Sequence, residues 1–333
     1  MNETRFSVII LIYNTKIEYI DLAIKSILNQ DYQNYEIVMI DDGSNEEVKQ
    51  YISQYESDKR FLIHHQENQG MVKSSMQGLK LATGDYIVYV DFDDYLDPHT
   101  LSIVNSKIVE YGVDVVMFNH VRFTDDINKI TELEPRFKEG MVDKKEVLKQ
   151  LCLLQTNTAW SRIGKRELYI GMEDHLNLDL INGEDVQQST YVIMNAKTFY
   201  YTPENLYYYR LIEEHRSYYD VKNMNDTNFM VPMYKMIFEK GEYEELLPVF
   251  KTSAANSIVY NAFRMCLWIK DRKERINLLN KLNEQEVTEL TASINKPMSP
   301  VSAVLFYIFR KKHYILLQLL AKVYDLIYGM DMI

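Results

Sequence analysis

The sequence predicts an α/β fold, in which a mostly parallel central sheet is flanked by helices and an all-helical region follows. Three observations lead to this prediction. Strand-like and helical patterns alternate through residues 6–100, which is typical of a parallel sheet covered by helices. The first strand-like run, Phe6–Tyr13, is apolar on both faces, as central strands of such sheets are. From about Asn223 only helical periodicity remains.

The first half of the sheet is predicted from four strand-like runs joined by three amphipathic helices. Ile17, Ile20 and Ile24 recur at helical spacing and predict the first of these helices. Asp97-Pro98 ends the fourth strand and places the start of a further helix near Thr100. We expect strands over 6–13, 35–40, 61–65 and 85–90, and helices over 17–29, 46–55 and 72–82.

A less regular second half follows. We expect a strand over 113–119 that extends through 121–124, a polar loop over 131–142, helices over 144–154 and 184–195, and short strands over 198–201 and 206–210. The change to purely helical patterns places a domain boundary near 215–225. We therefore divide the chain into residues 1–220, with halves 1–100 and 101–220, and a helical region of residues 221–333.

Composition excludes some classes of protein. The net charge is −11 and the isoelectric point about 5.2, whereas proteins that bind a nucleic-acid backbone carry a basic surplus, so no nucleic acid is expected as a partner. Cys152 and Cys266 both lie in apolar stretches and are expected to be buried thiols. There is no signal-peptide pattern, and no apolar run reaches the roughly 18 residues that span a bilayer, so we expect a cytoplasmic protein.

The first candidate site is the run Asp91-Phe92-Asp93-Asp94, directly after the predicted strand 85–90. Open α/β sheets bind ligands at the carboxyl ends of their strands. Mg²⁺ prefers oxygen ligands and often takes one or two carboxylates together with the phosphates of a substrate. The run therefore indicates a divalent-cation site, although by itself it also fits an acidic surface turn.

A second acidic pair, Asp41-Asp42, closes the strand 35–40 in the same way. A carboxylate there can accept hydrogen bonds from a base or a ribose, or it can cap the helix predicted from Glu46. The chain has no glycine-rich phosphate loop. The diphosphate of a bound nucleotide would thus need another positive partner, and a cation at Asp91 and Asp93 is the candidate.

A third acidic pair, Glu184-Asp185, follows Gly183 at the predicted start of a helix. The helix macrodipole keeps a carboxylate at this position ionised. An ionised carboxylate can act as a general base toward a hydroxyl within hydrogen-bond reach. The pair can equally be a plain helix cap.

Taken together, these motifs resemble family 2 glycosyltransferases with the GT-A (Rossmann-like) fold. The resemblance covers the first 100 residues and continues more thinly to about residue 217, through Trp160, Gly183–Asp185, Tyr207–Arg210 and Ser217. The matching stretches are 7–14, 26–30, 35–44, 68–70, 82–86 and 91–94.

The resemblance implies roles in donor binding for residues of the first half. Leu11 and Tyr13 would line the pocket of the uracil base. Asp42 would bond the base with Asn68 beside it, and Phe92 would belong to the same nucleotide-sugar site.

The resemblance also implies the chemistry. Asp91 would face the ribose and the metal shell, and Asp93 would bind the Mn²⁺ or Mg²⁺. Asp185 would be the catalytic base. Trp160 and Glu184 are candidates for the acceptor side, with a core residue as the alternative for Trp160.

The chain departs from the family pattern at two places. Leu11 stands where the family usually has Pro, and Ser75-Met76 stands where it usually has Arg-Asn. The missing Arg helps to hold the nucleotide in many relatives. Lys73, at a different position, is the candidate for the missing charge.

We therefore expect an inverting, metal-dependent hexosyl- or N-acetylhexosaminyl-transferase. It would move a sugar from a UDP-sugar to a glycan or a polyprenyl-diphosphate-linked acceptor in bacterial cell-surface polysaccharide synthesis. A sugar nucleotidyltransferase is one alternative, but the segment Leu11–Lys16 lacks the glycine-rich basic loop that such an enzyme needs. A degenerate, non-catalytic scaffold is the other, supported only by Ser75-Met76.

The C-terminal region has two interpretations. The helices can pack on the catalytic domain or on a second subunit of a homo-oligomer. Alternatively, residues 301–333 form an amphipathic, locally basic segment that lies on the cytoplasmic face of a membrane as a peripheral anchor.

Overall fold

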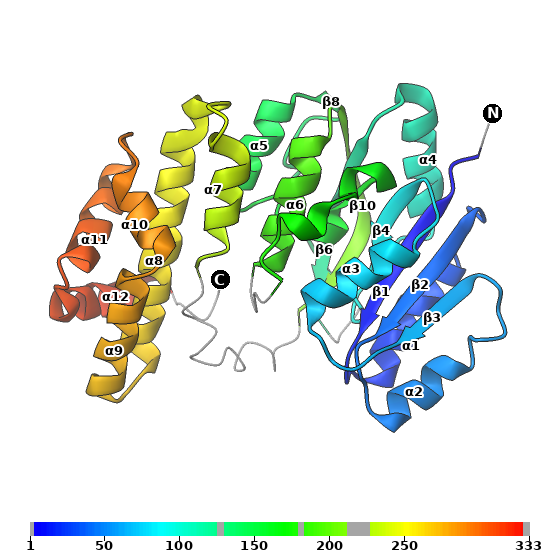
Figure 1. Cartoon of the computed structure of the whole chain (residues 1–333), viewed down its shortest axis with the longest axis horizontal. Coiled ribbons are helices and arrows are strands. Elements are labelled where there is room, and N and C mark those ends of the chain that lie inside the picture. Colours follow the sequence, from blue (N-terminus) through cyan, green and yellow to red (C-terminus); the bar gives the residue numbers. More distant parts are fainter. Residues whose placement is uncertain (1–2, 125–129, 179–182, 212–226, 329–333) are drawn as a thin grey trace. The chain divides into compact units, whose positions relative to one another are not determined.

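The computed structural model describes residues 3–124, 130–178, 183–211 and 227–328 (Figure 1). The chain divides into two compact units. The first contains residues 1–147, 158–179 and 191–212, and the second contains residues 148–157, 180–190 and 213–333. The predicted boundary near 215–225 and Ser217 lie outside the described residues.

The first unit is built on one sheet, which has ten strands within the described residues. Its main order is β3-β2-β1-β4-β9-β6-β10-β5. The pairs β3–β2, β2–β1, β1–β4 and β6–β10 are parallel, whereas β9 and β5 run antiparallel to their neighbours. The strands are β1 Phe6–Ile12, β2 Tyr35–Asp41, β3 Phe61–His65, β4 Tyr86–Tyr89, β5 Tyr95–Leu96, β6 Val115–Phe123, β7 Ile130–Glu132, β8 Gly140–Val142, β9 Arg162–Lys165 and β10 Phe199–Arg210.

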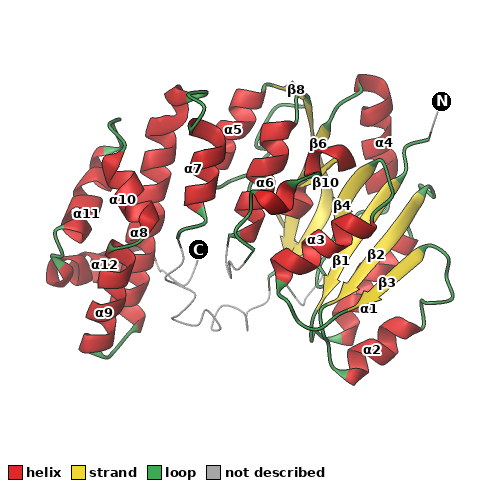
Figure 2. Cartoon of the chain, viewed as in Figure 1, coloured by secondary structure: helices red, strands yellow, loops and turns green. Residues whose placement is uncertain are grey.

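Helices flank this sheet, as Figure 2 shows in red beside the yellow strands. Every residue of β2 is buried, and so are all but one of β1, which identifies these two strands as the centre of the core. Helix α3 packs on both of them. The helices are α1 Ile17–Leu28, α2 Glu46–Ser53, α3 Met71–Leu81, α4 Thr100–Tyr111, α5 Lys144–Cys152 and α6 Glu184–Asn195. The predicted α/β fold with a mostly parallel sheet is confirmed, and its helices begin and end within three residues of the expected positions.

Two predictions for the second half of the sheet were wrong, and one strand was missed. Residues 131–142 are not only loop, because β7 pairs with β6 and β8 pairs with β10. These short strands are held by backbone bonds and expose Ile130 and Met141, so no apolar alternation marks them. The two expected strands near 198–210 are one strand, β10, whose register shifts between Thr202 and Asn205, around Pro203. Strand β9 was not predicted.

The second unit is helical, as expected for residues beyond 221. Helix α8 is its centre, and α7, α9, α10, α11 and α12 all contact it. The helices are α7 Met230–Phe238, α8 Leu247–Trp268, α9 Arg272–Asn283, α10 Glu286–Ser293, α11 Pro300–Arg310 and α12 Tyr314–Tyr328. Cys152 and Cys266 are buried thiols, as predicted, and burial raises the pKa of Cys152 to about 12.

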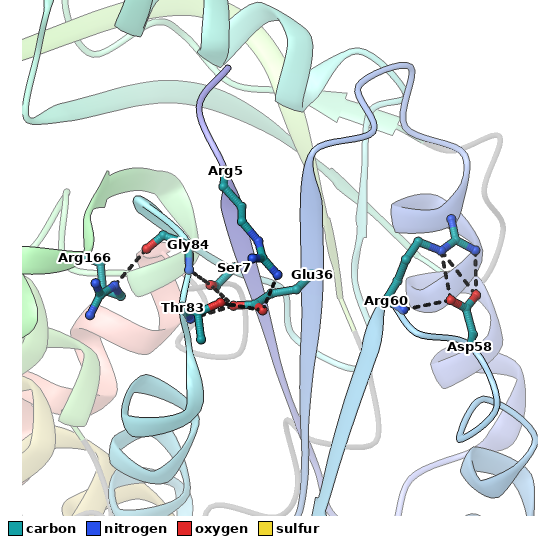
Figure 3. A network of polar contacts seen from close by, with 8 residues as sticks. All are labelled: Arg5, Ser7, Glu36, Asp58, Arg60, Thr83, Gly84 and Arg166. Carbon is teal, nitrogen blue, oxygen red and sulfur yellow. Dashed lines mark hydrogen bonds and ion pairs between the residues drawn. The ribbon is translucent and has the colours of Figure 1, made fainter. Parts of the chain in front are cut away.

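A buried carboxylate joins three segments at the amino ends of β1, β2 and β4 (Figure 3). Glu36 on β2 accepts hydrogen bonds from Ser7 Oγ at 2.6 Å and from the backbone N–H of Thr83 at 2.6 Å, and it pairs with Arg5 at 2.9 Å. Ser7 Oγ in turn accepts from the N–H of Gly84 at 2.8 Å. Only glycine allows this approach, because a Cβ on residue 84 would lie 2.6 Å from the backbone nitrogen of Ser7.

These contacts predict a pH-dependent contribution to stability. Burial alone raises the pKa of Glu36, but the hydrogen bonds from Ser7 and Thr83 outweigh it and leave the pKa lowered. The stabilisation is therefore fully present above the ordinary glutamate pKa of about 4.3 and is lost as the pH falls through the folded-state value. We expect Glu36→Gln to cost about 2 kcal/mol in the free energy of unfolding near neutral pH, since hydrogen bonds to a charged acceptor are lost.

Urea denaturation across the acidic range measures this difference. The gap between wild type and Glu36→Gln should shrink as the pH falls. Glu47→Gln, at an exposed site on α2, is the matched control and should change little. A gap that stays constant with pH would contradict the assignment.

Candidate active site

The opposite edge of the sheet, at the carboxyl ends of β2, β1 and β4, brings the predicted donor residues together. Strand β1 lies between β2 and β4, so Asp42 and Asp91 follow the two strands that flank it. Leu11, near the end of β1, is opposite Ile40 of β2. Tyr13 follows β1 and is 47% exposed, so its ring is open to a ligand.

Asp42 holds the loop that follows β3. One carboxylate oxygen accepts from Gln66 Nε2 at 2.8 Å and from the N–H of Gln69 at 2.9 Å, and the other accepts from the N–H of Gly70 at 2.9 Å. The backbone of Asn68 lies against Gly43 so closely that a Cβ there would be 2.8 Å from its nitrogen. Asn68 is thus beside Asp42, and Asn68 itself is exposed. A carboxylate has about four acceptor positions, so Asp42 has capacity for a further donor.

The acidic run after β4 has members in different environments. Asp91 is exposed, Phe92 and Asp93 are half-buried, and Asp94 is fully buried. Asp94 accepts from Tyr207 Oη at 2.8 Å and from the N–H of Arg210 at 2.7 Å. Burial, with the charges of Asp93 and Asp91, raises the pKa of Asp94 well above its usual range. The side chains of Asp91 and Asp93 are therefore the ones a ligand can reach.

Two residues of β10 position this run, and the sequence reasoning assigned them no such role. Tyr207 Oη accepts from the N–H of Asp91 at 3.1 Å while it donates to Asp94. Arg210 Nε donates to the carbonyl of Asp93 at 2.8 Å, and its guanidinium lies over the rings of Tyr19 and Phe123. Periodicity could not reveal these contacts, because they join residues more than a hundred positions apart.

Trp160 is placed in the core rather than at an open surface. It is 5% exposed, stacks on Tyr207 with ring centroids 4.4 Å apart, and meets the ring of His120 edge-on at 4.7 Å. A platform for an acceptor sugar needs an exposed ring face. The structure therefore favours the core alternative for Trp160, and an acceptor role for this residue stays a prediction.

Helix α3 carries the departure from the family pattern. Ser75 is buried with its Oγ 2.9 Å from Tyr89 Oη, and Met76 is 5% exposed, so neither brings a charge. Lys73 lines a cavity of about 170 Å³ together with Gln66 and Gln69, two residues that contact Asp42. An adjoining cavity of about 240 Å³ shares Met76 and Lys80 with it. Lys73 is therefore close to the loop that Asp42 holds.

Glu184 and Asp185 form the first turn of α6, as predicted. Both residues belong to the second compact unit. Gly183 has a φ of +82°, and a Cβ there would lie 2.3 Å from the ring of Phe229, so a side chain at this position is strained and blocked. Burial raises the pKa of Glu184. Asp185 is half-buried, and the helix macrodipole favours its ionised form.

The residues at the edge of the sheet fit a hard divalent cation that shares its shell with a substrate. Among the described residues there is no group of three or more His, Cys, Asp or Glu that would hold a metal by themselves. Two reachable carboxylates on a short, well-held loop are what Mg²⁺ or Mn²⁺ needs when phosphate oxygens and water complete its shell.

Carboxylates that follow β2 and β4, on either side of β1 in a parallel part of the sheet, are the arrangement typical of ligand-binding α/β domains. Residues 7–171, about half of the chain, match the family described as glycosyl transferase family 2. The chain belongs to this family.

Individual relatives agree with this. The chain is 27% identical over 219 residues to glycosyltransferase GlyA of Streptococcus pneumoniae. This match covers 63% of this chain and 31% of GlyA. It is 26% identical over 263 residues to the putative glycosyltransferase EpsH of Bacillus subtilis. This match covers 77% of this chain and 70% of EpsH. The chain thus spans less than a third of GlyA.

The fold is similar to that of TarS residues 1–349 from S. aureus, solved in complex with UDP-GlcNAc. The TM-score is 0.75 at 21% identity, over 96% of this chain and 91% of that one. This likeness confirms the predicted GT-A fold with a C-terminal helical region. Within the described part of the chain, no helix has both the length and the apolar character to cross a bilayer.

Proposed function

We propose that this protein is an inverting, metal-dependent glycosyltransferase that uses a UDP-sugar. The observation that carries the proposal is the placement of Asp42, Asp91 and Asp93 along one edge of a family 2 sheet. The hexose or N-acetylhexosamine would pass to a hydroxyl of a glycan or of a polyprenyl-diphosphate-linked glycan, as in bacterial cell-surface polysaccharide synthesis.

In this proposal the end of β1 receives the base. Leu11 and the exposed ring of Tyr13 contact the uracil, and the remaining acceptor capacity of Asp42 takes its N–H. Asn68 closes the same pocket. Lys73, across the loop from Asp42, supplies the positive charge that Ser75-Met76 does not.

Asp91 and Asp93 would hold Mn²⁺ or Mg²⁺ against the diphosphate, with Phe92 between them. The bound cation would supply charge neutralisation for the departing UDP. Tyr207 and Arg210 keep the loop in place through its backbone, so both carboxylates keep their positions when a ligand arrives.

Asp185 acts as the general base. The acceptor hydroxyl oxygen forms a bond to the anomeric carbon while the bond from that carbon to the diphosphate oxygen breaks. The proton of the hydroxyl passes to the Asp185 carboxylate, and UDP leaves with the electron pair. One displacement inverts the anomeric centre, so no covalent sugar–enzyme intermediate forms.

A screen of UDP-sugars with and without Mn²⁺ tests the proposal. UDP-GlcNAc is the first compound to try, because it is bound in the TarS structure of similar fold. The right donor should raise the melting temperature in the presence of metal and release UDP. Release of pyrophosphate from a sugar phosphate and a nucleoside triphosphate would indicate a nucleotidyltransferase, and no binding of any nucleotide-sugar would indicate a scaffold.

A further inference from the structure

Helix α12 lies at the red end of the chain in Figure 1. One of its faces is wholly aliphatic and exposed. Leu326 is 88% exposed and Ile315 is 72% exposed. At 3.6 residues per turn, the members of this face fall within an arc of about 120°. The α12 face consists of Ile315, Leu316, Leu319, Val323, Leu326 and Ile327.

The opposite side of the same helix already serves the core of the second unit. Leu317 and Ala321 are fully buried, and α12 packs on α8. The ring of Tyr324 lies 5.8 Å from that of Phe263 on α8. The α12 face is therefore a second apolar side on a helix that is already docked. Large contiguous apolar patches of this kind mark interaction sites on soluble proteins.

The charges around the α12 face are basic. Residues 300–328 contain four Lys or Arg and a single acidic residue, Asp325, in a chain whose net charge is −11. Arg310 pairs with Glu289 at 2.8 Å and Lys312 lies 3.9 Å from Glu284. The exposed Lys311 and Lys322 remain as cations outside those two pairs. An aliphatic face with lysines beside it is the pattern of helices that lie in the headgroup region of anionic membranes.

We propose that α12 binds the surface of a bilayer that contains anionic lipid, with the α12 face inserted among the acyl chains and Lys311 and Lys322 at the headgroups. A second copy of the chain is the less favourable occupant. Docked through the same face with two-fold symmetry, it would bring two basic segments together. An anionic bilayer instead complements both the apolar and the basic character. The proposal does not depend on transfer activity.

Co-sedimentation of the full chain with vesicles tests it. The protein should bind phosphatidylcholine vesicles that contain phosphatidylglycerol. It should bind pure phosphatidylcholine vesicles more weakly, and high salt should weaken binding to both kinds of vesicle. Leu319→Gln with Leu326→Gln should lower the partition coefficient about ten-fold or more, since two leucines that would insert among the acyl chains are lost. Lys311→Gln with Lys322→Gln should lower it about five-fold per lysine on the anionic vesicles alone.

The matched control is Val109→Gln with Ile276→Gln, which replaces exposed aliphatic residues of α4 and α9. It should bind as wild type does. All these sites are exposed and Gln is a good helix former, so the variants should keep the circular dichroism and melting temperature of wild type. Equal partition of wild type and the Leu319/Leu326 variant would overturn the proposal. So would light scattering that shows a dimer for wild type and a monomer for that variant.

Discussion

Asp185→Asn is expected to keep UDP-sugar binding and to lose transfer, with a fall in kcat of about 100- to 10,000-fold. The asparagine keeps the size and the hydrogen-bonding reach of the side chain but cannot accept the proton of the acceptor hydroxyl. Because Asp185 is half-buried in the first turn of α6, the change removes a charge from the helix N-terminus at a cost of less than about 1 kcal/mol. The fold should therefore survive.

Initial rates of UDP release and the dissociation constant for the donor, measured on the same preparation, separate binding from chemistry. Asp143→Asn is the matched control. Asp143 is an exposed aspartate directly before α5, where it accepts from the N–H of Lys145 at 2.9 Å. That variant should turn over at the wild-type rate. Unchanged turnover of Asp185→Asn would remove this residue from the mechanism and leave donor binding by the first unit unaffected.

The sequence predicted the core of the sheet well because local pattern and tertiary role agree there. Residues 8–12 are an apolar run and form most of β1, and the helix at 184–195 begins and ends at the predicted residues. The alternation of strands and helices then places Asp42 and Asp91 at one edge without any knowledge of contacts. The placement of these two residues at one edge is a consequence of the sheet topology, and the topology follows from the order of the strands and helices along the chain.

The parts that the sequence did not predict depend on contacts between distant residues. Strands β7, β8 and β9 are short, and their pairing with β6, β10 and β4 leaves no periodic signal. Trp160 has the same local pattern whether its ring is buried or open, and only contacts with distant residues, such as Tyr207 and His120, decide between the two. The same tyrosine holds Asp94, so one β10 residue links the core to the acidic loop.

The contrast between neighbours on that loop leads to the second large effect. Asp93→Ala should greatly weaken metal-dependent binding of UDP or the UDP-sugar, while the melting temperature of the ligand-free protein stays near that of wild type. The side chain is half-buried, and the loop is held through the Asp93 carbonyl, which the substitution keeps. The protein would supply only two carboxylates to the metal, so the loss of one of them should weaken Mn²⁺-dependent binding about 100-fold or more.

Asp94→Ala is the matched partner with the opposite expectation. Its carboxylate is fully buried and accepts from Tyr207 Oη and from the N–H of Arg210, so its removal leaves two buried donors without an acceptor and should cost about 3 kcal/mol in the free energy of unfolding. Calorimetric titration of UDP with and without Mn²⁺, beside thermal melts of both variants, measures each effect. If Asp93→Ala bound UDP and Mn²⁺ as wild type does, the cation would have to be held elsewhere. If instead it melted as low as Asp94→Ala, the Asp93 side chain would be part of the framework of the loop, and Asp91 alone would face the ligand.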